Sequence, residues 1–355
     1  MNNQILSTLL KKLIQLKANK TPFLSCFVNL EQPRHESLAE LEGRARLLRH
    51  ALPAKHRQDF DDALGEIQNY LATSLNPHSH GVAIYSRWGD EPVFLPMQFE
   101  APLKTHLSAD MRPEIYPLIE LKDVYHRFVT VITTENEARI LETTLGGITE
   151  EILTERPELR ERLGREWTRE HYQNHKRERE DQFIREKIKI LDDLMSQRGH
   201  NHLIIAGSPK MVGKFTRALP RRLREKVIST VASNPGDDIS PILREAVHLF
   251  IAAENIESHH RVGALEAALY RTGLAAIGFQ DCRQALTAGY ADLLLVDQHH
   301  TETRQREELV RLAAQLEIPV ETVNRNSVLE SMGGFGCLLR FLPPGRQTPR
   351  RTLAA

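Results

Sequence analysis

The stretch DCRQALTAGYADLLLVDQ, residues 281–298, places a helix pattern directly before a buried-strand pattern. Its first part carries apolar residues at helical spacing and stops at Gly289, a residue type that commonly ends helices. The continuous apolar run at 293–296 then predicts a strand covered on both faces. TRQREELVRLAAQLEIPVETV (303–323) repeats the order of helix and strand, and SVLESMGGFGCLLRFL (327–342) adds a short helix, a glycine turn and a last strand. We therefore predict a compact βαβαβ-type unit in an α/β/α arrangement.

The stretches upstream predict a second α/β layer. RFVTVITT (127–134) and EARILETTL (137–145) have strand patterns, and HNHLIIAGSP (200–209) predicts a further buried strand. Ser208 suits a helix N-cap and Pro209 the first helical position, so a helix should follow. A charged loop and long helix, extending to about residue 195, separate these strands.

The N-terminal segment predicts a smaller α/β domain that ends near Met111. ILSTLLKKLIQL (5–16) has helical spacing, PFLSCFVNL (22–30) is strand-like, and a charged helical stretch covers about 36–75. HGVAIYS (80–86) and PVFLPMQF (92–99) predict a strand pair. A chain of 355 residues favours several domains. We predict an N-terminal α/β domain (1–112), a central α/β domain (113–262), a C-terminal α/β/α domain (263–345) and a basic tail (346–355).

Charge is balanced overall but segregated locally. Lys+Arg and Asp+Glu number 47 each, so any affinity for nucleic acid must come from patches. Seven basic residues lie between 210 and 226 against Glu225 alone, the first 20 residues carry four lysines and no acid, and the chain after Glu330 carries four arginines and no acid. Each cluster alone would suit a solvated face, but three in a neutral chain predict phosphate-contacting surfaces.

Several familiar site patterns are missing. GSPKMVGKF (207–215) has five residues between its glycines and Phe215 after the lysine, so it is no phosphate loop. GGFG (333–336) lies between a helix and a strand and predicts a turn. No HExxH or GxSxG occurs, and His171 and His175, four apart, lack further ligands at metal spacing. We expect no metal and no small-molecule cofactor.

Cysteine usage and the lack of export signals predict a cytoplasmic protein. Cys26, Cys282 and Cys337 lie far apart without a CxxC pair, which argues against a disulfide framework and a zinc ribbon. The N-terminus has no signal-peptide pattern, and no apolar run approaches membrane-spanning length. We expect no membrane partner.

The order of the three segments resembles the class-one release factor and Pelota superfamily. LAAIGFQDCRQALTAGYADLLLVDQ and IPVETVNRNSVLESMGGFGCLLRF look like its C-terminal domain, which is similar to the kink-turn-binding ribosomal-protein fold. FVTVITTENEARILETTLGGITEE with HNHLIIAGSPKMVGKF resembles its RNase-H-like central domain. The whole chain is most similar to the bacterial and archaeal release-factor-like group that includes Balon-type ribosome hibernation factors.

The stretch GREWTREHYQNH, residues 164–175, matches a degenerate form of that superfamily's catalytic loop. The release-factor-like group carries a loop resembling GGWSQxRYQRH where true release factors carry GGQ, and the landmarks retained here are Trp167, Tyr172, Gln173 and His175. The two glycines are replaced by Arg165 and Glu166, and the Ser-Gln pair by Thr168 and Arg169. Glycine permits backbone angles and close approaches that side chains forbid, and no obvious general base remains. We therefore expect no catalytic residue.

Stop-codon decoding is also not expected. The NIKS and YxCxxxF patterns with which release factors read stop codons are absent, and Cys26 in FLSCFVNL looks like a core strand residue. What the resemblance implies is a non-catalytic, ribosome-binding protein that imitates tRNA in the A site of idle or stalled ribosomes, with elongation factor Tu as a possible partner. The residues expected to contact ribosomal RNA are Arg165, Trp167, Arg169, His171, Tyr172, Gln173, His175, Lys176, Arg177, Lys210, Lys214, Arg217, Arg221 and Arg222.

Two other functions remain open from the sequence. A peptidyl-tRNA hydrolase or tRNA nuclease in ribosome rescue would need Gln173 or His175 to replace the missing loop glutamine. An RNA-binding adaptor would use the C-terminal domain alone.

Overall fold

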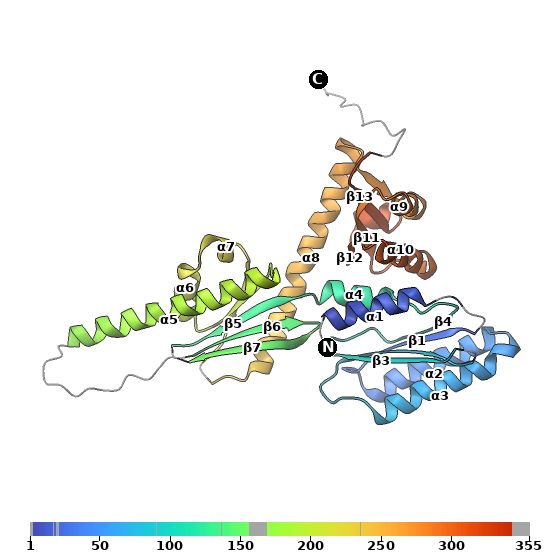
Figure 1. The fold of residues 1–355 in the computed structure, drawn as a ribbon, viewed down its shortest axis with the longest axis horizontal. Helices are drawn as coiled ribbons and strands as arrows, with labels where there is room; N and C mark the ends of the chain where they lie inside the picture. The colour runs from blue at the N-terminus through green and yellow to red at the C-terminus, as the bar shows by residue number, and fades with distance from the viewer. Residues whose placement is uncertain are drawn as a thin grey trace, which may run out of the picture. The chain divides into compact units, whose positions relative to one another are not determined.

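The computed structural model describes residues 3–16, 18, 21–89, 91–135, 137–155, 169–234 and 236–342, with the side chains of 3, 155 and 169–177 outside the description. The chain divides into two compact units (Figure 1): unit 1 combines residues 1–126 with 254–355, and unit 2 is residues 127–253. Unit 2 is narrower at both ends than the predicted central domain, and the three-part division stays a prediction. None of the described helices is both long and apolar enough to cross a membrane.

The N-terminal part of unit 1 is an antiparallel sheet in the order β3-β2-β1-β4. Its strands are β1 (Phe23–Asn29), β2 (Gly81–Arg87), β3 (Val93–Phe99) and β4 (His106–Asp110). Its helices are α1 (Asn3–Gln15), α2 (Arg34–Ala51), the 3₁₀ turn η1 (Ala54–His56), α3 (Arg57–Thr73) and α4 (Tyr116–Val124). The strand pair and α1 are confirmed. The expected single helical stretch is two helices, interrupted at Pro53, and β4 was not predicted.

The hydrophobic core explains why α2 and α3 lie on one face of this sheet. Alternate β1 residues Leu24, Cys26 and Val28 are buried against Phe60 and Ile67 of α3. Cys26 is 1% exposed, so its assignment to a core strand is confirmed.

The C-terminal part of unit 1 is a mixed sheet in the order β10-β13-β11-β12. Its strands are β10 (Ala275–Ile277), β11 (Ala291–Asp297), β12 (Val320–Val323) and β13 (Phe335–Leu339). Its helices are α9 (Gly278–Thr287), α10 (Thr303–Gln315), α11 (Ser327–Ser331) and the second half of α8 (Ile239–Arg271). From β11 to β13 the elements follow the predicted βαβαβ order. β11 and β12 are parallel, whereas β13, which follows the glycine turn at 333–334, lies antiparallel between β10 and β11.

Unit 2 is built on a five-stranded sheet in the order β7-β6-β5-β8-β9. Its strands are β5 (Phe128–Thr133), β6 (Glu137–Thr144), β7 (Gly147–Glu155), β8 (Leu203–Gly207) and β9 (Val227–Ala232). Its helices are α5 (Arg169–Arg198), α6 (Pro209–Ala218), α7 (Arg221–Arg224) and the first half of α8. β5, β8 and β9 are parallel, while β6 and β7 extend the sheet as antiparallel hairpins. Neither β7, β9 nor the 33-residue α8 was predicted.

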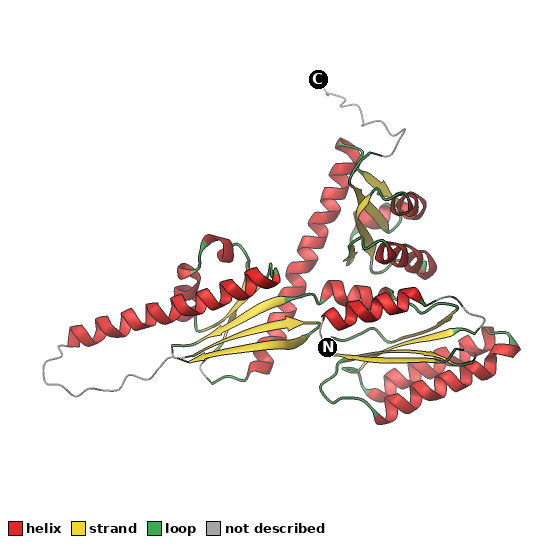
Figure 2. Ribbon diagram, viewed as in Figure 1, coloured by secondary structure: helices red, strands yellow, loops and turns green. Residues whose placement is uncertain are grey.

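Unit 2 has three layers, which Figure 2 shows as helices on either side of its sheet. On one face, α5, α6 and α7 bury Leu191, Phe215 and Leu223 against the strands. On the other, α8 buries Phe250, whose ring stacks on Phe128 with 4.4 Å between centroids. The mixed α/β architecture with three sheets agrees with the predicted fold class.

Candidate nucleic-acid interface

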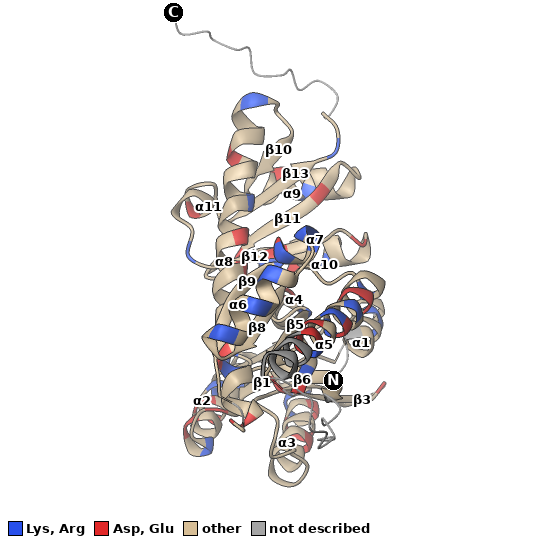
Figure 3. Ribbon diagram, turned by 90° about the vertical axis from the view of Figure 1, so that its left-hand side faces the viewer, with Lys and Arg blue, Asp and Glu red and all other residues tan. Residues whose placement is uncertain are grey.

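The positively charged cluster predicted between residues 210 and 226 lies along α6 and α7 and ends at Lys226, just after α7; the two helices carry blue segments in Figure 3. Met211, Phe215 and Leu223 turn inward, and all three are almost fully buried. The intervening positions point away from the core, as the helical repeat requires. We call this set the basic face: Lys210, Lys214, Arg217, Arg221, Arg222, Arg224 and Lys226.

Three consecutive residues, Gly207, Ser208 and Pro209, determine where helix α6 begins. Gly207 ends β8 at φ +154°, and a Cβ there would lie 2.5 Å from the carbonyl oxygen of Thr133. Ser208 is the N-cap and accepts a hydrogen bond from the amide of Met211 at 3.4 Å, and Pro209 occupies the first turn. The predicted cap and proline position are confirmed. This turn fixes where α6 leaves the sheet, and so the direction of its basic side.

Two ion pairs join the basic face to α5. Lys214 Nζ lies 2.5 Å from Glu180 Oε1, and Arg222 pairs with Asp192. Both carboxylates are largely buried by these contacts, whereas the Arg222 side chain is 67% exposed. These acids are distant in sequence, so the count of a single acid against seven bases understated the negative charge beside the cluster.

Two further ion pairs lie at the surface. Lys210 Nζ is 3.6 Å from Glu135 Oε1, and Arg221 Nε is 2.8 Å from Glu225 Oε1 one turn away. Exposed pairs of this kind contribute about 0–1 kcal/mol, because water and salt screen them. A phosphate can therefore replace the carboxylate at low cost.

Arg217 and Arg224 carry the least compensated charge of the basic face. Arg217 Nε donates to the Gly213 carbonyl at 3.1 Å. Arg224 donates to the carbonyls of Arg217 and Leu219 at 3.1 and 3.0 Å. Among the residues that the structure describes, neither guanidinium pairs with an acid, and both are exposed. Arg224, which the sequence-based contact set left out, is therefore as available at this surface as Arg217.

The degenerate loop lies only partly within the description. Arg165 and Trp167 fall in residues 156–168, outside the described residues. Arg169 begins α5, so residues 169–175 of the predicted loop are helical. The other predicted contact residues of this helical end are His171, Tyr172, Gln173, His175, Lys176 and Arg177, whose side chains lie outside the description. Their contacts with RNA stay predictions.

The helical end of the loop is continuous with the part of α5 that contacts the basic face. Glu180, the partner of Lys214, follows Arg177 by less than one turn of the same helix. Glu180, which holds Lys214 of the basic face, is therefore close along the chain to the aromatic and histidine positions of the loop.

Unit 2 also contains a buried polar cluster that the sequence did not reveal. Arg198 pairs with both Glu142 and Glu150, and His200 Nε2 lies 3.3 Å from Glu142 Oε1. Glu142 and His200 are nearly inaccessible. Burial is the largest cause of a lowered pKa at His200, opposed by the Glu142 carboxylate. The cluster ties the end of α5 to β6 and β7, and burial withholds Glu142 and His200 from a substrate.

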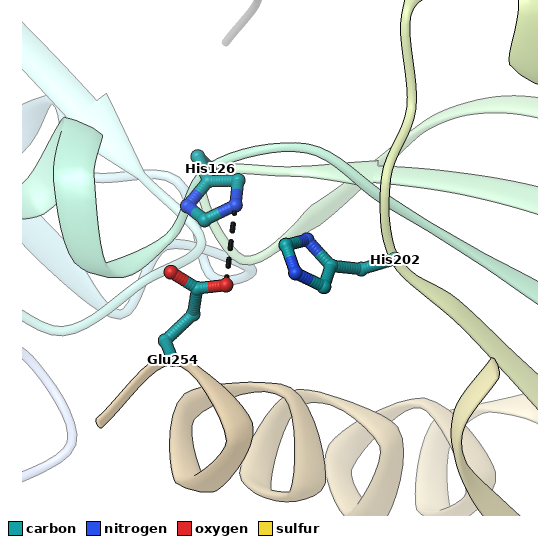
Figure 4. A group of neighbouring side chains, drawn as sticks. All are labelled: His126, His202 and Glu254. Atoms are coloured by element: carbon teal, nitrogen blue, oxygen red, sulfur yellow. Dashed lines mark ion pairs between the residues drawn. The ribbon is translucent and has the colours of Figure 1, made fainter. Parts of the chain in front are cut away.

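A second histidine–carboxylate pair lies in unit 1. His126 Nε2 is 3.4 Å from Glu254 Oε1 (Figure 4), and His126 Nδ1 lies 2.8 Å from the Asp123 carbonyl. Burial raises the pKa of Glu254 to about 8, helped by the neighbouring acids Glu257, Glu321 and Asp123. Figure 4 also draws His202, which belongs to unit 2, where its ring packs edge-on against Phe250 at 5.5 Å.

The histidine pairs of the C-terminal half, far apart in sequence, share a contact residue in unit 1. His259 Nε2 lies 2.9 Å from the Asn324 carbonyl oxygen, and His299 Nε2 lies 3.0 Å from Asn324 Oδ1. Sequence spacing gave no reason to bring them together, because helix α8 and the end of β11 meet only in the fold. Both rings act here as hydrogen-bonding groups that hold Asn324.

The comparisons with known proteins agree with the resemblance in the sequence. Residues 113–250 match the model of bacterial archaeo-eukaryotic release factor family 10. No curated protein matches the chain. Similar solved structures include the archaeal translation termination factor aRF1, with 18% identity, a TM-score of 0.30 and coverage of 96% of this chain and 99% of that chain.

Two other solved structures are similar over much of the chain. An archaeal Pelota, in a model of ribosome-bound Pelota and ABCE1, has 16% identity and a TM-score of 0.45, covering 94% of each chain. Dom34 of S. cerevisiae, described as a translation termination-like factor that interacts with Hbs1, has 12% identity and a TM-score of 0.41, covering 75% of this chain and 82% of that chain.

Proposed function

We propose that the chain is a release-factor-like, non-catalytic, ribosome-binding protein that occupies the A site of idle or stalled ribosomes. The observation that carries the proposal is the exposed basic face, which lies within the segment that matches the release-factor family.

The chemistry of the basic face suits ribosomal RNA. Guanidinium groups bind phosphate oxygens through paired N–H donors, which lysine cannot do. Arg217 and Arg224 offer such donors without an acid partner among the described residues, and the weakly held pair of Arg221 can be exchanged. Because the chain has no net charge, its affinity for ribosomal RNA should depend on this local surface rather than on long-range attraction by the chain as a whole.

The loop sequence supports a binding role rather than hydrolysis. Arg165 and Glu166 stand where catalytic loops have glycines, and Arg169 replaces the glutamine that positions water. Trp167 and Tyr172 are retained, and aromatic stacking on an unpaired base contributes roughly 1–3 kcal/mol. The loop would therefore hold RNA by stacking and charge.

The names of similar proteins suggest the setting. One similar Pelota was solved with the ribosome and ABCE1, and Dom34 interacts with Hbs1. By analogy we propose the ribosome as the main partner, elongation factor Tu as a delivering partner, and the cytoplasm as the place of action. Hibernation under stress, with the chain imitating tRNA, is the physiological role that fits a non-catalytic A-site occupant.

A matched pair of variants tests ribosome binding. Full-length wild type, Arg217→Gln/Arg224→Gln and the control Arg46→Gln/Lys55→Gln, exposed residues of unit 1, would be sedimented with ribosomes through low-salt sucrose gradients. Wild type and control should co-sediment, and the basic-face variant should stay near the top. Free wild-type protein would refute ribosome binding. Equal binding by all three would favour an adaptor that uses the C-terminal domain alone.

A separate assay tests the absence of catalysis. Purified ribosomes carrying peptidyl-tRNA should release no peptide above background, and their tRNA should stay intact, when wild-type protein is added. Peptide release that disappears in Gln173→Ala or His175→Ala would establish the hydrolase alternative while leaving ribosome binding in place.

A further inference from the structure

A cleft of about 750 Å³ in unit 1 has an unusual lining of arginines. The five come from α2, the segment after β4, α9 and α10, and we call the site the arginine cleft: Arg44, Arg112, Arg283, Arg304 and Arg311. Its volume lies within the range of about 300–1,000 Å³ that is usual for small-molecule sites. The basic face belongs to unit 2, so this site is separate from the proposed ribosome contact.

Helical spacing explains how the cleft acquires its charge. Residues 304, 308, 311 and 315 of α10 all line it, and positions three or four apart share one side of a helix. Arg44 and Leu48, four positions apart on α2, obey the same rule and also line the cleft. Arg112 enters from the segment that follows β4.

Most of the carboxylates of the cleft already accept hydrogen bonds or ion pairs. Glu114 Oε2 accepts from Ser108 Oγ at 2.5 Å and lies 3.2 Å from His106 Nε2. Asp110 Oδ1 accepts from the amide of Met111 at 2.6 Å, and Glu308 pairs with Arg283 at 3.3 Å.

Glu307 is likewise occupied by protein donors. Its carboxylate accepts from the amides of Ile115 and Tyr116 and from Arg311, at 2.8 Å for the arginine. Protein donors therefore already use many of the acceptor oxygens of the cleft's acids, and the lining has five arginines against four acids.

Four of the arginines, in contrast, have side-chain N–H donors that make no hydrogen bond with the described residues. Arg311 is 5% exposed, and its NH1 is buried without a hydrogen-bond partner among the described residues. Arg44 uses only its Nε, which donates to the Leu107 carbonyl at 2.5 Å. Arg112 and Arg304 are exposed and make no side-chain hydrogen bond or ion pair with any part of the chain that the structure describes. A buried guanidinium donor without an acceptor is costly, so an anionic ligand that accepts from these groups would be favoured in the cleft.

We propose that the arginine cleft binds a ligand carrying two or more phosphate groups. A single carboxylate offers about four lone-pair sites, fewer than the donors that Arg44, Arg112, Arg304 and Arg311 hold in reserve. Phosphate oxygens match the guanidinium fork and can bridge several arginines at once. Leu48, Met111 and Leu312 supply apolar contact for the part of the ligand that carries the phosphates.

Such phosphates have two sources, a free polyphosphorylated small molecule or the backbone of RNA. Inorganic tripolyphosphate serves as the probe for the first, and a short single-stranded RNA for the second. Binding of each would be measured on the full chain by titration calorimetry at low salt, in buffer without divalent cations.

The variant pair is Arg112→Gln/Arg304→Gln with Arg46→Gln as control. The two substituted arginines are exposed and make no hydrogen bond or ion pair with the described residues, so their replacement breaks no such contact. Arg46 lies on the same helix as Arg44 but outside the cleft. Wild type and control should bind tripolyphosphate equally. The test variant should bind about 10- to 100-fold more weakly, the effect of losing two charge-assisted contacts.

The outcomes separate cleanly. No tripolyphosphate binding by wild type, or equal binding by the test variant, would overturn the proposal. A matching loss of RNA affinity in the test variant would assign the phosphates to RNA, and unchanged RNA affinity would assign them to a free small molecule. Unfolding curves of all three proteins should coincide, because the substituted side chains are exposed. The result does not depend on ribosome binding, which the basic-face variants test separately.

Discussion

The carboxylate of Glu307 accepts a hydrogen bond from the backbone amide of Tyr116, with 3.0 Å between Oε2 and N. Amides in the first turn of a helix have no partner within it, and α4 receives no side-chain cap from its own N-cap residue. Its cap comes instead from α10, 191 residues further along the chain. One carboxylate therefore joins the N-terminal and C-terminal parts of unit 1.

Removing this cap should destabilise unit 1. Glu307→Ala leaves the amides of Ile115 and Tyr116 without this acceptor and removes the ion-pair partner of the buried Arg311, at a cost of about 2–3 kcal/mol in the free energy of unfolding. Urea denaturation followed by tryptophan fluorescence measures this loss. In a Trp167→Phe background, Trp88 of unit 1 is the one remaining tryptophan. Glu308→Ala, which removes only an exposed ion pair, should cost less than about 1 kcal/mol. Equal losses would contradict the capping role.

The stability of unit 1 should fall as pH rises. Burial, followed by the nearby Glu321 carboxylate, raises the pKa of Asp123 to about 7, and burial raises that of Glu307 to about 7. A carboxyl whose pKa is higher in the folded chain binds its proton more tightly there. Its contribution is therefore complete below the unfolded pKa of about 4 and is lost as pH rises through about 7.

Hydrogen exchange of α4 peptides, corrected for intrinsic exchange, would show this as weaker protection near pH 8 than near pH 5.5. Asp123→Asn keeps an oxygen that accepts from the amide and hydroxyl of Thr322, at 2.6 and 2.8 Å in the wild type, so it should flatten the pH dependence without abolishing protection. Asp181→Asn, at an exposed site in unit 2, is the control. An unchanged slope in Asp123→Asn would refute the assignment.

Two glycines of unit 2 should respond in opposite directions to alanine. Gly207→Ala places a Cβ 2.5 Å from the Thr133 carbonyl oxygen at a backbone angle that side chains disfavour, and should cost about 2–4 kcal/mol. Gly213→Ala lies inside α6, where the nearest atom is a flexible Arg217 nitrogen at 3.5 Å, and should gain up to about 1 kcal/mol. Urea denaturation curves for the unfolding of unit 2 give both changes in the free energy of unfolding. A stabilising Gly207→Ala would show that the backbone between β8 and α6 tolerates a side chain at this position.

The salt dependence of ribosome binding should count the phosphate contacts of the basic face. Each contact to single-stranded or duplex nucleic acid contributes about 0.7–0.9 to the slope of log affinity against log salt concentration. Arg217→Gln/Arg224→Gln should therefore lower the slope by about 1.4–1.8, and Arg46→Gln/Lys55→Gln should leave it unchanged. Weaker binding with an unaltered slope would mean that these arginines act through packing rather than on phosphates.

The sequence predicted the fold best where apolar patterns were continuous. β1, β5, β8 and β11 and helices α1, α6 and α10 follow from periodicity and caps. β7 was missed because GITEEILTE places glutamates along a strand, where Glu150 pairs with Arg198 and Glu151 with Arg139. The direction of β13 was not predicted, because a pattern of apolar residues identifies a strand without specifying which neighbours it pairs with or in which direction.

The basic cluster was predicted, but its neutralisation was not. Charge counting found Lys214 and Arg222 without knowing that α5 brings Glu180 and Asp192 beside them. The same limit hid the arginine cleft, whose members are up to 267 positions apart and share no motif. Residues that are close in sequence reveal a cluster on one helix. A site assembled from several elements can be recognised only when the fold is known.

The discontinuity of unit 1 has a consequence for the order in which the chain folds during synthesis. Chains emerge from the ribosome N-terminus first, at about 5–20 residues per second. All of unit 2 has emerged before Glu307 is made, so its sheet can close while α4 still lacks its cap. Unit 1 therefore begins to form first and is completed last. An early stop in translation would leave the N-terminal sheet of unit 1 without its C-terminal part, although unit 2 is already folded.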